Sequence, residues 1–112
     1  MNFSAHKLTF DGVYADAYIV LFDRDSGDLV NASTGAAGAA VTWAEAKIQA
    51  AKHAQSDVWV VTIPALEYGK RYTLYLLDGF AAADKSDEPV ESFYYDPKRM
   101  QAFDSSLELP RN

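Results

Sequence analysis

The segment from residue 13 to residue 23 alternates between two sets of side chains, the pattern typical of a β-strand. One set is small or aliphatic and predicts the face that points to the core: Val13, Ala15, Ala17, Ile19 and Leu21. The opposite set is unusually apolar for a face in contact with water: Tyr14, Asp16, Tyr18, Val20 and Phe22. This second face is therefore expected to meet another subunit or to lie beneath a loop of the same chain.

The residues that follow this strand have the composition of a β-hairpin. Residues 23–28 are rich in Asp and include Gly27, which supplies the positive φ that a tight turn needs. A short strand is then expected to return over residues 29–32. The small residues at 33–40 follow, and we expect them to form a loop.

Other apolar runs predict further strands. Residues 58–63 are apolar on both faces and predict a central strand, which Pro64 ends because proline has no N–H for the ladder. Residues 7–10 predict an edge strand, and two more strands are predicted over residues 70–78 and 90–96.

The start of the strand at 70–78 has a distinctive spacing. Leu66, Gly69 and Tyr72 follow one another at intervals of three residues. This spacing resembles the tyrosine corner of β-sandwiches, in which a buried ring ends in a hydroxyl bonded to upstream backbone. We therefore predict that Tyr72 is buried and that its hydroxyl bonds to backbone near Leu66 or Glu67.

Residues 43–54 are open to two interpretations. Thr42 and Glu45 have the spacing of a capping box, and the Ala, Lys, Gln and Glu that follow favour a helix. The alternation of Ile48 and Ala50 with polar neighbours favours an extended strand instead. We expect a short helix within residues 43–54, with a strand as the alternative.

These elements together predict one domain over residues 1–112. About seven short strands at regular spacing indicate an all-β, antiparallel sandwich of the immunoglobulin-like or fibronectin-like kind. A parallel α/β fold is excluded, because at most one helix lies between strands. The tail at 98–112 contains apolar residues without an obvious place in the sandwich, and we expect it to dock on a partner.

The composition limits the classes of partner and compartment. The chain has no Cys, which excludes disulfides and thiolate sites, and its net charge of −6 argues against a nucleic-acid partner. The first residues do not resemble a signal peptide, and no run approaches the roughly 20 apolar residues of a membrane span. We expect no membrane partner, and a cytoplasmic location unless the protein leaves inside an assembled particle.

Candidate chemistry is sparse. Asp23, Asp25 and Asp28 have oxygens suited to Ca²⁺, but their spacing does not match a calcium-binding loop, and we expect a solvated hairpin turn in which Arg24 balances the charge. The two histidines are far apart in sequence and lack the further ligands that zinc needs. No nucleophile or phosphate-binding motif is present. We therefore expect no metal, no cofactor and no enzymatic activity.

The order of these motifs resembles two groups of sandwich domains. Residues 17–23 with the turn at Gly27, the strand at 59–63 and the strand that starts at Gly69 and Tyr72 look like a fibronectin-type or carboxypeptidase-regulatory-like domain. The spacer with Trp43 and the run from Trp59 to Tyr72 are similar to small accessory sandwiches in structural proteins of tailed phages. The resemblance implies a virion accessory protein that docks on a larger assembly, in the head, neck, tail or baseplate.

The predicted function is accordingly that of a structural or interaction module. We expect contacts with other protein subunits, in a homo-oligomer or a larger assembly, with the virion as the location. The candidate interface residues are outward aromatic and aliphatic side chains and two leucines of the tail: Tyr18, Val20, Phe22, Tyr75, Leu107 and Leu109. The alternative is a carbohydrate-binding or adhesion sandwich, because exposed Trp and Tyr rings also stack on sugars.

Overall fold

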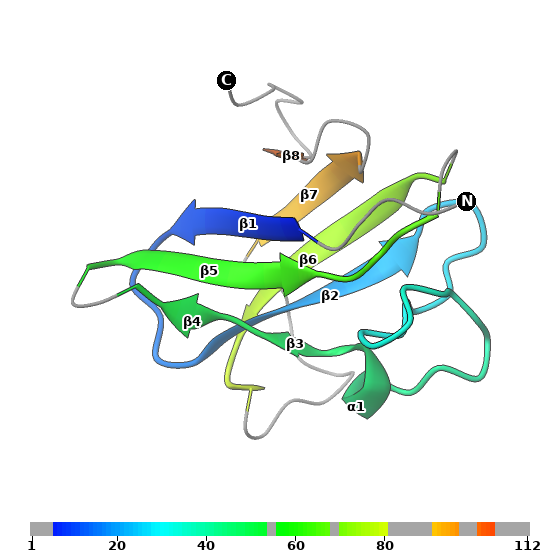
Figure 1. The fold of residues 1–112 in the computed structure, drawn as a ribbon, viewed down its shortest axis with the longest axis horizontal. Helices are drawn as coiled ribbons and strands as arrows, with labels where there is room; N and C mark the ends of the chain where they lie inside the picture. Colours follow the sequence, from blue (N-terminus) through cyan, green and yellow to red (C-terminus); the bar gives the residue numbers. More distant parts are fainter. Residues whose placement is uncertain (1–5, 54–55, 68–69, 81–90, 97–100, 105–112) are drawn as a thin grey trace.

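The computed structural model describes residues 6–53, 56–67, 70–80, 91–96 and 101–104, and these form two antiparallel β-sheets that pack face to face (Figure 1). The three-stranded sheet, here the small sheet, has the order β1-β5-β4, and the five-stranded sheet, here the large sheet, has the order β3-β2-β6-β7-β8. The elements are β1 (His6–Asp11), β2 (Ala17–Asp23), α1 (Trp43–Ala46), β3 (Ile48–Gln49), β4 (Ala51–Lys52), β5 (Val58–Ile63), β6 (Tyr72–Asp78), β7 (Glu91–Asp96) and β8 (Gln101–Asp104).

The strand order is that of the immunoglobulin fold. In that fold, strands B, E and D lie side by side in one sheet, and strands C, F and G in the other. Here β1, β5 and β4 take the places of B, E and D, while β3, β2, β6 and β7 take those of C′, C, F and G. The predicted all-β antiparallel sandwich is therefore confirmed. Among the described residues, no strand takes the place of strand A beside β1.

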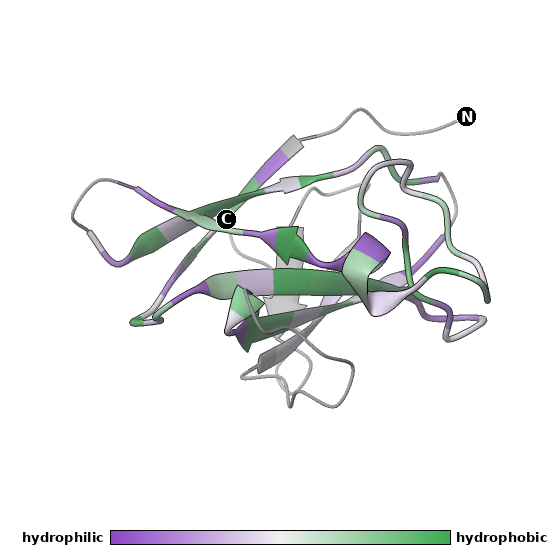
Figure 2. Cartoon of the chain, turned by 90° about the horizontal axis from the view of Figure 1, so that it is seen from below, coloured by the Kyte–Doolittle hydropathy of each residue, from purple (hydrophilic) through white to green (hydrophobic). Residues whose placement is uncertain are grey.

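The main core lies between the two sheets, as the alternation in sequence predicts. Ala17, Ile19 and Leu21 of β2 are buried there, and Trp59, the second residue of β5, is 5% exposed. The indole N–H of Trp59 donates to the carbonyl of Gly12 at 2.9 Å, so the ring is buried without an unpaired donor. Figure 2 shows that strongly hydrophobic segments lie mainly in the strands, and that hydrophilic ones gather at their ends.

The expected strand at 13–23 begins later than its alternation suggests. Val13 is 85% exposed, so its predicted inward position is wrong. Residues 12–16 carry the chain from the small sheet to the large one, and therefore pair with neither sheet in this stretch. The Asp78 carboxylate fixes the start of β2 by accepting the N–H groups of Ala15 and Asp16 at 3.1 and 2.7 Å.

The segment 43–54 is helical only at its start. The capping box at Thr42 and Glu45 is present, but α1 has only 4 residues and ends at Ala46. The helix expected beyond Ala46 is wrong, and the strand alternative holds for β3 and β4. Tertiary pairing decides this outcome, because β3 pairs with β2 in the large sheet and β4 with β5 in the small one. This extended segment thus passes from one sheet to the other.

The hairpin and the loop after it form closed turns. Gly27 adopts a φ of 78°, and the backbone N–H of Asp23 donates to the carbonyl of Asp28 at 2.9 Å. The predicted return strand is reduced to isolated bridges, from Phe22 to Leu29 and from Val30 to Ala37. The chain therefore leaves β2, turns, and comes back beside the outer face of the large sheet.

Part of the tail belongs to the sandwich itself. Residues 101–104 form β8, which pairs with β7 at the edge of the large sheet. The expectation that the whole tail from residue 98 docks on a partner is therefore wrong for this part. Residues 105–112, with Leu107 and Leu109, lie outside the described residues.

Candidate functional site

The outer face of the large sheet carries a second cluster of apolar side chains, separate from the main core. Its buried members are Tyr18 and Val20 of β2, Leu77 of β6 and Ala46 of α1. The side chains packed against them come mostly from the segment between the hairpin and α1 and from the same sheet: Phe22, Leu29, Val41, Trp43, Tyr75 and Phe80. The chain thus covers part of this face with residues of its own segment 29–46, here the covering segment, and with Phe80 after β6.

This cover corrects part of the predicted interface. Tyr18 and Val20 are both 0% exposed, so the expectation that they face outward to another subunit is wrong. Both side chains lie instead beneath other residues of the same chain, which is the alternative that the sequence also allowed for this face. The physical reason is that Tyr18 packs edge-on against Phe80 at 6.0 Å, and that Tyr18 and Val20 belong to one apolar cluster with side chains of the covering segment. Phe22 and Tyr75 are only half-buried.

Phe22 and Tyr75 line an open hollow of about 380 Å³ at one end of this face. Their ring centroids are 4.7 Å apart, and Phe22 also lies 6.2 Å from the ring of Trp43. The remaining lining is small, aliphatic or turn-forming, with one carboxylate: Gly27, Asp28, Leu29, Gly38, Ala39 and Val41. The hollow is therefore an apolar depression with an aromatic wall and one acidic residue.

Local sequence places each wall of the hollow. The hairpin turn positions Asp28 and Leu29, and the backbone N–H of Gly38 donates to the carbonyl of Leu29 at 3.2 Å. The N–H of Val41 then donates to the carbonyl of Gly38 at 3.2 Å. Trp43 is the first helical residue after the Thr42 cap, so the capping box fixes the backbone position from which its side chain extends.

Trp43 contributes an unpaired donor. Its indole Nε1 is buried, and it has no hydrogen-bond partner within the part of the chain that the structure describes. A buried N–H without an acceptor costs about 1–3 kcal/mol relative to a paired one.

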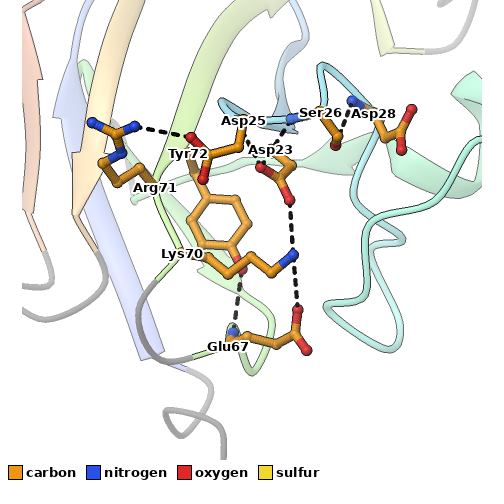
Figure 3. Close-up of polar contacts among 8 residues, drawn as sticks. All are labelled: Asp23, Asp25, Ser26, Asp28, Glu67, Lys70, Arg71 and Tyr72. Atoms are coloured by element: carbon orange, nitrogen blue, oxygen red, sulfur yellow. Dashed lines mark hydrogen bonds and ion pairs between the residues drawn. The ribbon is translucent and has the colours of Figure 1, made fainter.

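The hairpin beside the hollow is joined to the tyrosine corner by a network of polar contacts (Figure 3). Tyr72 is 1% exposed, and its hydroxyl accepts the backbone N–H of Glu67 at 3.2 Å. The predicted corner is thereby confirmed. Lys70, between these two residues in sequence, reaches back to Asp23 with its ammonium group 3.1 Å from Oδ2.

Asp23 is the only buried charged residue among those described, at 2% exposed. Burial alone would raise the pKa of its carboxyl. The backbone N–H of Asp25, the Lys70 ammonium and the backbone N–H of Ser26 together outweigh burial and lower that pKa below its ordinary value of 3.8. The carboxylate therefore stays ionised and holds the turn closed.

The same contacts bear on the candidate calcium ligands. Oδ1 of Asp23 accepts from Asp25 and Ser26, and Oδ2 faces Lys70. Arg71 pairs with Asp25 at 2.9 Å. Within the described ranges, no group of three or more His, Cys, Asp or Glu side chains is arranged to hold a metal ion. Asp28 has no ion-pair partner in the described part, and it faces the hollow instead.

The sequence identified only part of this site. It selected Phe22 and Tyr75, and the structure brings these two together, whereas Leu107 and Leu109 lie outside the described residues. It did not select the covering residues as part of a site: Leu29, Gly38, Val41 and Trp43. The sequence did contain one signal for a closed turn in this segment. Asn31 before Ser33 and Thr34 is typical of an Asx turn, and its Oδ1 accepts the backbone N–H groups of Ser33 and Thr34.

Comparison of the chain with known protein families, with curated proteins and with solved structures found no match. None of the helical residues described forms a helix long and apolar enough to cross a membrane.

Proposed function

We propose that the protein is a non-enzymatic interaction module that binds another protein chain through the hollow. The occupant is a bulky apolar side chain of the partner, flanked by a Lys or Arg. The observation that carries this proposal is the half-buried aromatic wall of Phe22, Trp43 and Tyr75 around an open depression. Buried aromatic anchors and pockets of this kind dominate the energetics of protein interfaces.

The polar groups at the hollow define the rest of the occupant. Asp28 is the one charged residue that lines the hollow among those described, and the chain has a net charge of −6, so a basic flank on the partner is favoured. An extended peptide segment supplies both features: an apolar side chain and a neighbouring basic residue.

The biological setting is proposed from the sequence. The spacing of Trp43, Trp59, Pro64 and Tyr72 is similar to that of accessory sandwiches in tailed-phage structural proteins. That resemblance supports a role in a virion, where the module would attach to a neighbouring subunit of a symmetric assembly.

A blocked hollow tests the proposal without removing any packed side chain. Gly38 lines the hollow outside the left-handed region of φ, and an added Cβ would meet only Val41, at an ordinary 3.8 Å. Gly38→Leu should therefore fill the depression and leave the fold intact. Ala36→Leu is the matched control, because Ala36 is exposed on the same loop and does not line the hollow.

The probe is a random peptide library selected on the immobilised wild-type protein. The peptides that are enriched should carry a large apolar residue beside Lys or Arg. A synthetic copy should bind Gly38→Leu at least about tenfold more weakly than wild type, and Ala36→Leu as tightly as wild type. Asp28→Asn should weaken binding a few-fold at low salt and have less effect at high salt.

Two outcomes would overturn the proposal. One is a set of selected peptides that bind Gly38→Leu and wild type equally. The other is a panel of methyl glycosides that shifts the amide resonances of the lining residues while the peptides do not, which would identify a carbohydrate site instead.

A further inference from the structure

β1 is an edge strand of the small sheet in the part of the chain that the structure describes. It lies at the end of the small sheet and pairs with β5 along its whole length, from His6 opposite Ile63 to Asp11 opposite Val58. Its other edge has no strand beside it among the described residues, where strand A lies in an immunoglobulin domain. An edge strand of this kind presents a row of backbone N–H and C=O groups that can pair with another strand.

The side chains of β1 are complementary to themselves when the strand is reversed. Lys7, Thr9 and Asp11 are exposed on the outer face, and Leu8 and Phe10 are partly buried against the main core. In an antiparallel pair centred on Thr9, Lys7 of each copy lies opposite Asp11 of the other. Leu8 then lies opposite Phe10, and Thr9 opposite its own equivalent.

We propose that β1 pairs antiparallel with β1 of a second copy of this chain, in the register centred on Thr9. The two copies are related by a two-fold axis that passes between their Thr9 residues, so the two small sheets join into one continuous sheet. Each interface then contains the Lys7–Asp11 ion pair twice, as a closed two-fold interface requires. Directly opposite side chains have Cβ atoms about 4.5–5.5 Å apart, which is within reach of an ion pair.

The neighbours of these charges within the chain support an intermolecular role. Lys7 lies opposite Thr62, Thr9 opposite Val60 and Asp11 opposite Val58 on the outer face of the small sheet. Neither charge therefore faces an opposite charge across β5. Exchanging the charges leaves the β1–β5 pairing unchanged, and this makes the register testable by mutation.

Charge reversal is the first test, with self-association measured by sedimentation velocity over a range of concentrations. Lys7→Glu and Asp11→Lys should each weaken the homodimer at least about tenfold, because both cross-strand pairs become repulsive. An equimolar mixture of the two variants should form a heterodimer, since each repulsive pair is then replaced by an attractive one. The double variant should recover wild-type association.

The second test uses the absence of Cys from the chain. Thr9→Cys places two thiols across the two-fold axis, where opposite Cα atoms are about 4.5–5.5 Å apart, within the range of a disulfide. Mild oxidation should therefore link the dimer. Thr62→Cys is the matched control, because Thr62 is exposed on the same face but lies on the central strand. It should link far more slowly.

Three results would overturn the inference. One is a wild-type protein that stays monomeric at the highest soluble concentration. Another is a dimer whose stability does not change with Lys7→Glu but which dissociates with Lys52→Glu, the same change on β4, because the contact would then involve the other edge of the small sheet. The third is a monomer whose outer-edge β1 amides are protected from hydrogen exchange, because another segment of the chain would then cover the edge.

Discussion

Tyr72 connects the corner before β6 to the strand itself through one hydroxyl. That hydroxyl accepts the backbone N–H of Glu67 at 3.2 Å, and the ring is 1% exposed. Tyr72→Phe should lower the free energy of unfolding by about 1 kcal/mol, because the N–H loses its acceptor. Tyr75→Phe is the control, since no hydrogen bond of the Tyr75 hydroxyl is present among the described residues. Equal losses in urea denaturation of the two variants would contradict the assigned role.

Asp23 links stability to pH at the same scale. Its pKa in the folded protein lies below the ordinary 3.8, so folding favours the ionised form. This contribution is complete above about pH 4 and is lost as the pH falls through the folded pKa. Asp23→Asn should cost about 1–2 kcal/mol at pH 7, and the difference from wild type should narrow as the pH falls below 4.

Urea denaturation between pH 7 and pH 2.5 measures this difference. Asp57→Asn is the matched control, because the Asp57 side chain is 59% exposed and its Oδ1 makes only a long contact, 3.8 Å, with Nζ of Lys52. It should change stability little at any of these pH values. A difference between Asp23→Asn and wild type that is constant with pH would show that the carboxylate charge does not stabilise the turn.

Residue-level motifs were predictable where their partners lie close in sequence. The tyrosine corner joins Glu67 to Tyr72, and the capping box joins Thr42 to Glu45, so short spacings specify both. The Lys70–Asp23 contact spans 47 positions, and no spacing rule indicates it. Such contacts follow from the fold, which must be known first.

At the scale of elements, the segment from α1 to β4 shows that strand pairing can override the local propensity for a helix. The residues after Ala46 favour a helix by composition, yet Ile48 pairs with Ile19 and the N–H of Ala50 donates to the carbonyl of Ala17 at 3.0 Å. Each of these partners lies in β2. Ile48 also packs against the main core, so an extended segment buries apolar surface that a helix there would not.

The covering segment 29–46 depends on one close backbone approach. Gly35 is buried with a φ of 76°, and a Cβ at this position would collide with the backbone carbonyl of Ala65. Gly27 has a similar φ of 78°, but a Cβ there would meet nothing within 4 Å. Gly35→Ala should therefore destabilise the protein by about 3 kcal/mol or more, and Gly27→Ala by about 1 kcal/mol.

Thermal and urea denaturation separate these two costs. Gly27→Ala reports the conformational cost alone, and the difference between the variants reports the steric contact with Ala65. Gly35→Ala should also loosen the packing of Val30 and Ala37 against the main core, because these two residues flank Gly35 on the same loop. Similar stability of the two variants would show that the segment 29–46 does not rely on this contact.

At the scale of the whole molecule, the fold class could be predicted because it depends on repeated local signals. Alternation, turn residues and the tyrosine corner each indicate a strand or its end, and their sum indicates a sandwich. The hollow could not be predicted in the same way. Its walls come from β2, the covering segment and β6, and only the three-dimensional path of residues 29–46 shows that Tyr18 and Val20 are covered while Phe22 and Tyr75 are not.

The whole molecule is also expected to fold without a metal ion. Among the acidic residues of the hairpin, both oxygens of Asp23 are engaged with N–H groups or Lys70, and Asp25 is paired with Arg71. A calcium ion would have to displace these contacts and still lack most of its six to eight oxygen ligands. Melting curves should therefore coincide with excess chelator and with millimolar Ca²⁺. A melting temperature several degrees higher in Ca²⁺ than in chelator would contradict this, because a ligand stabilises only the state that binds it.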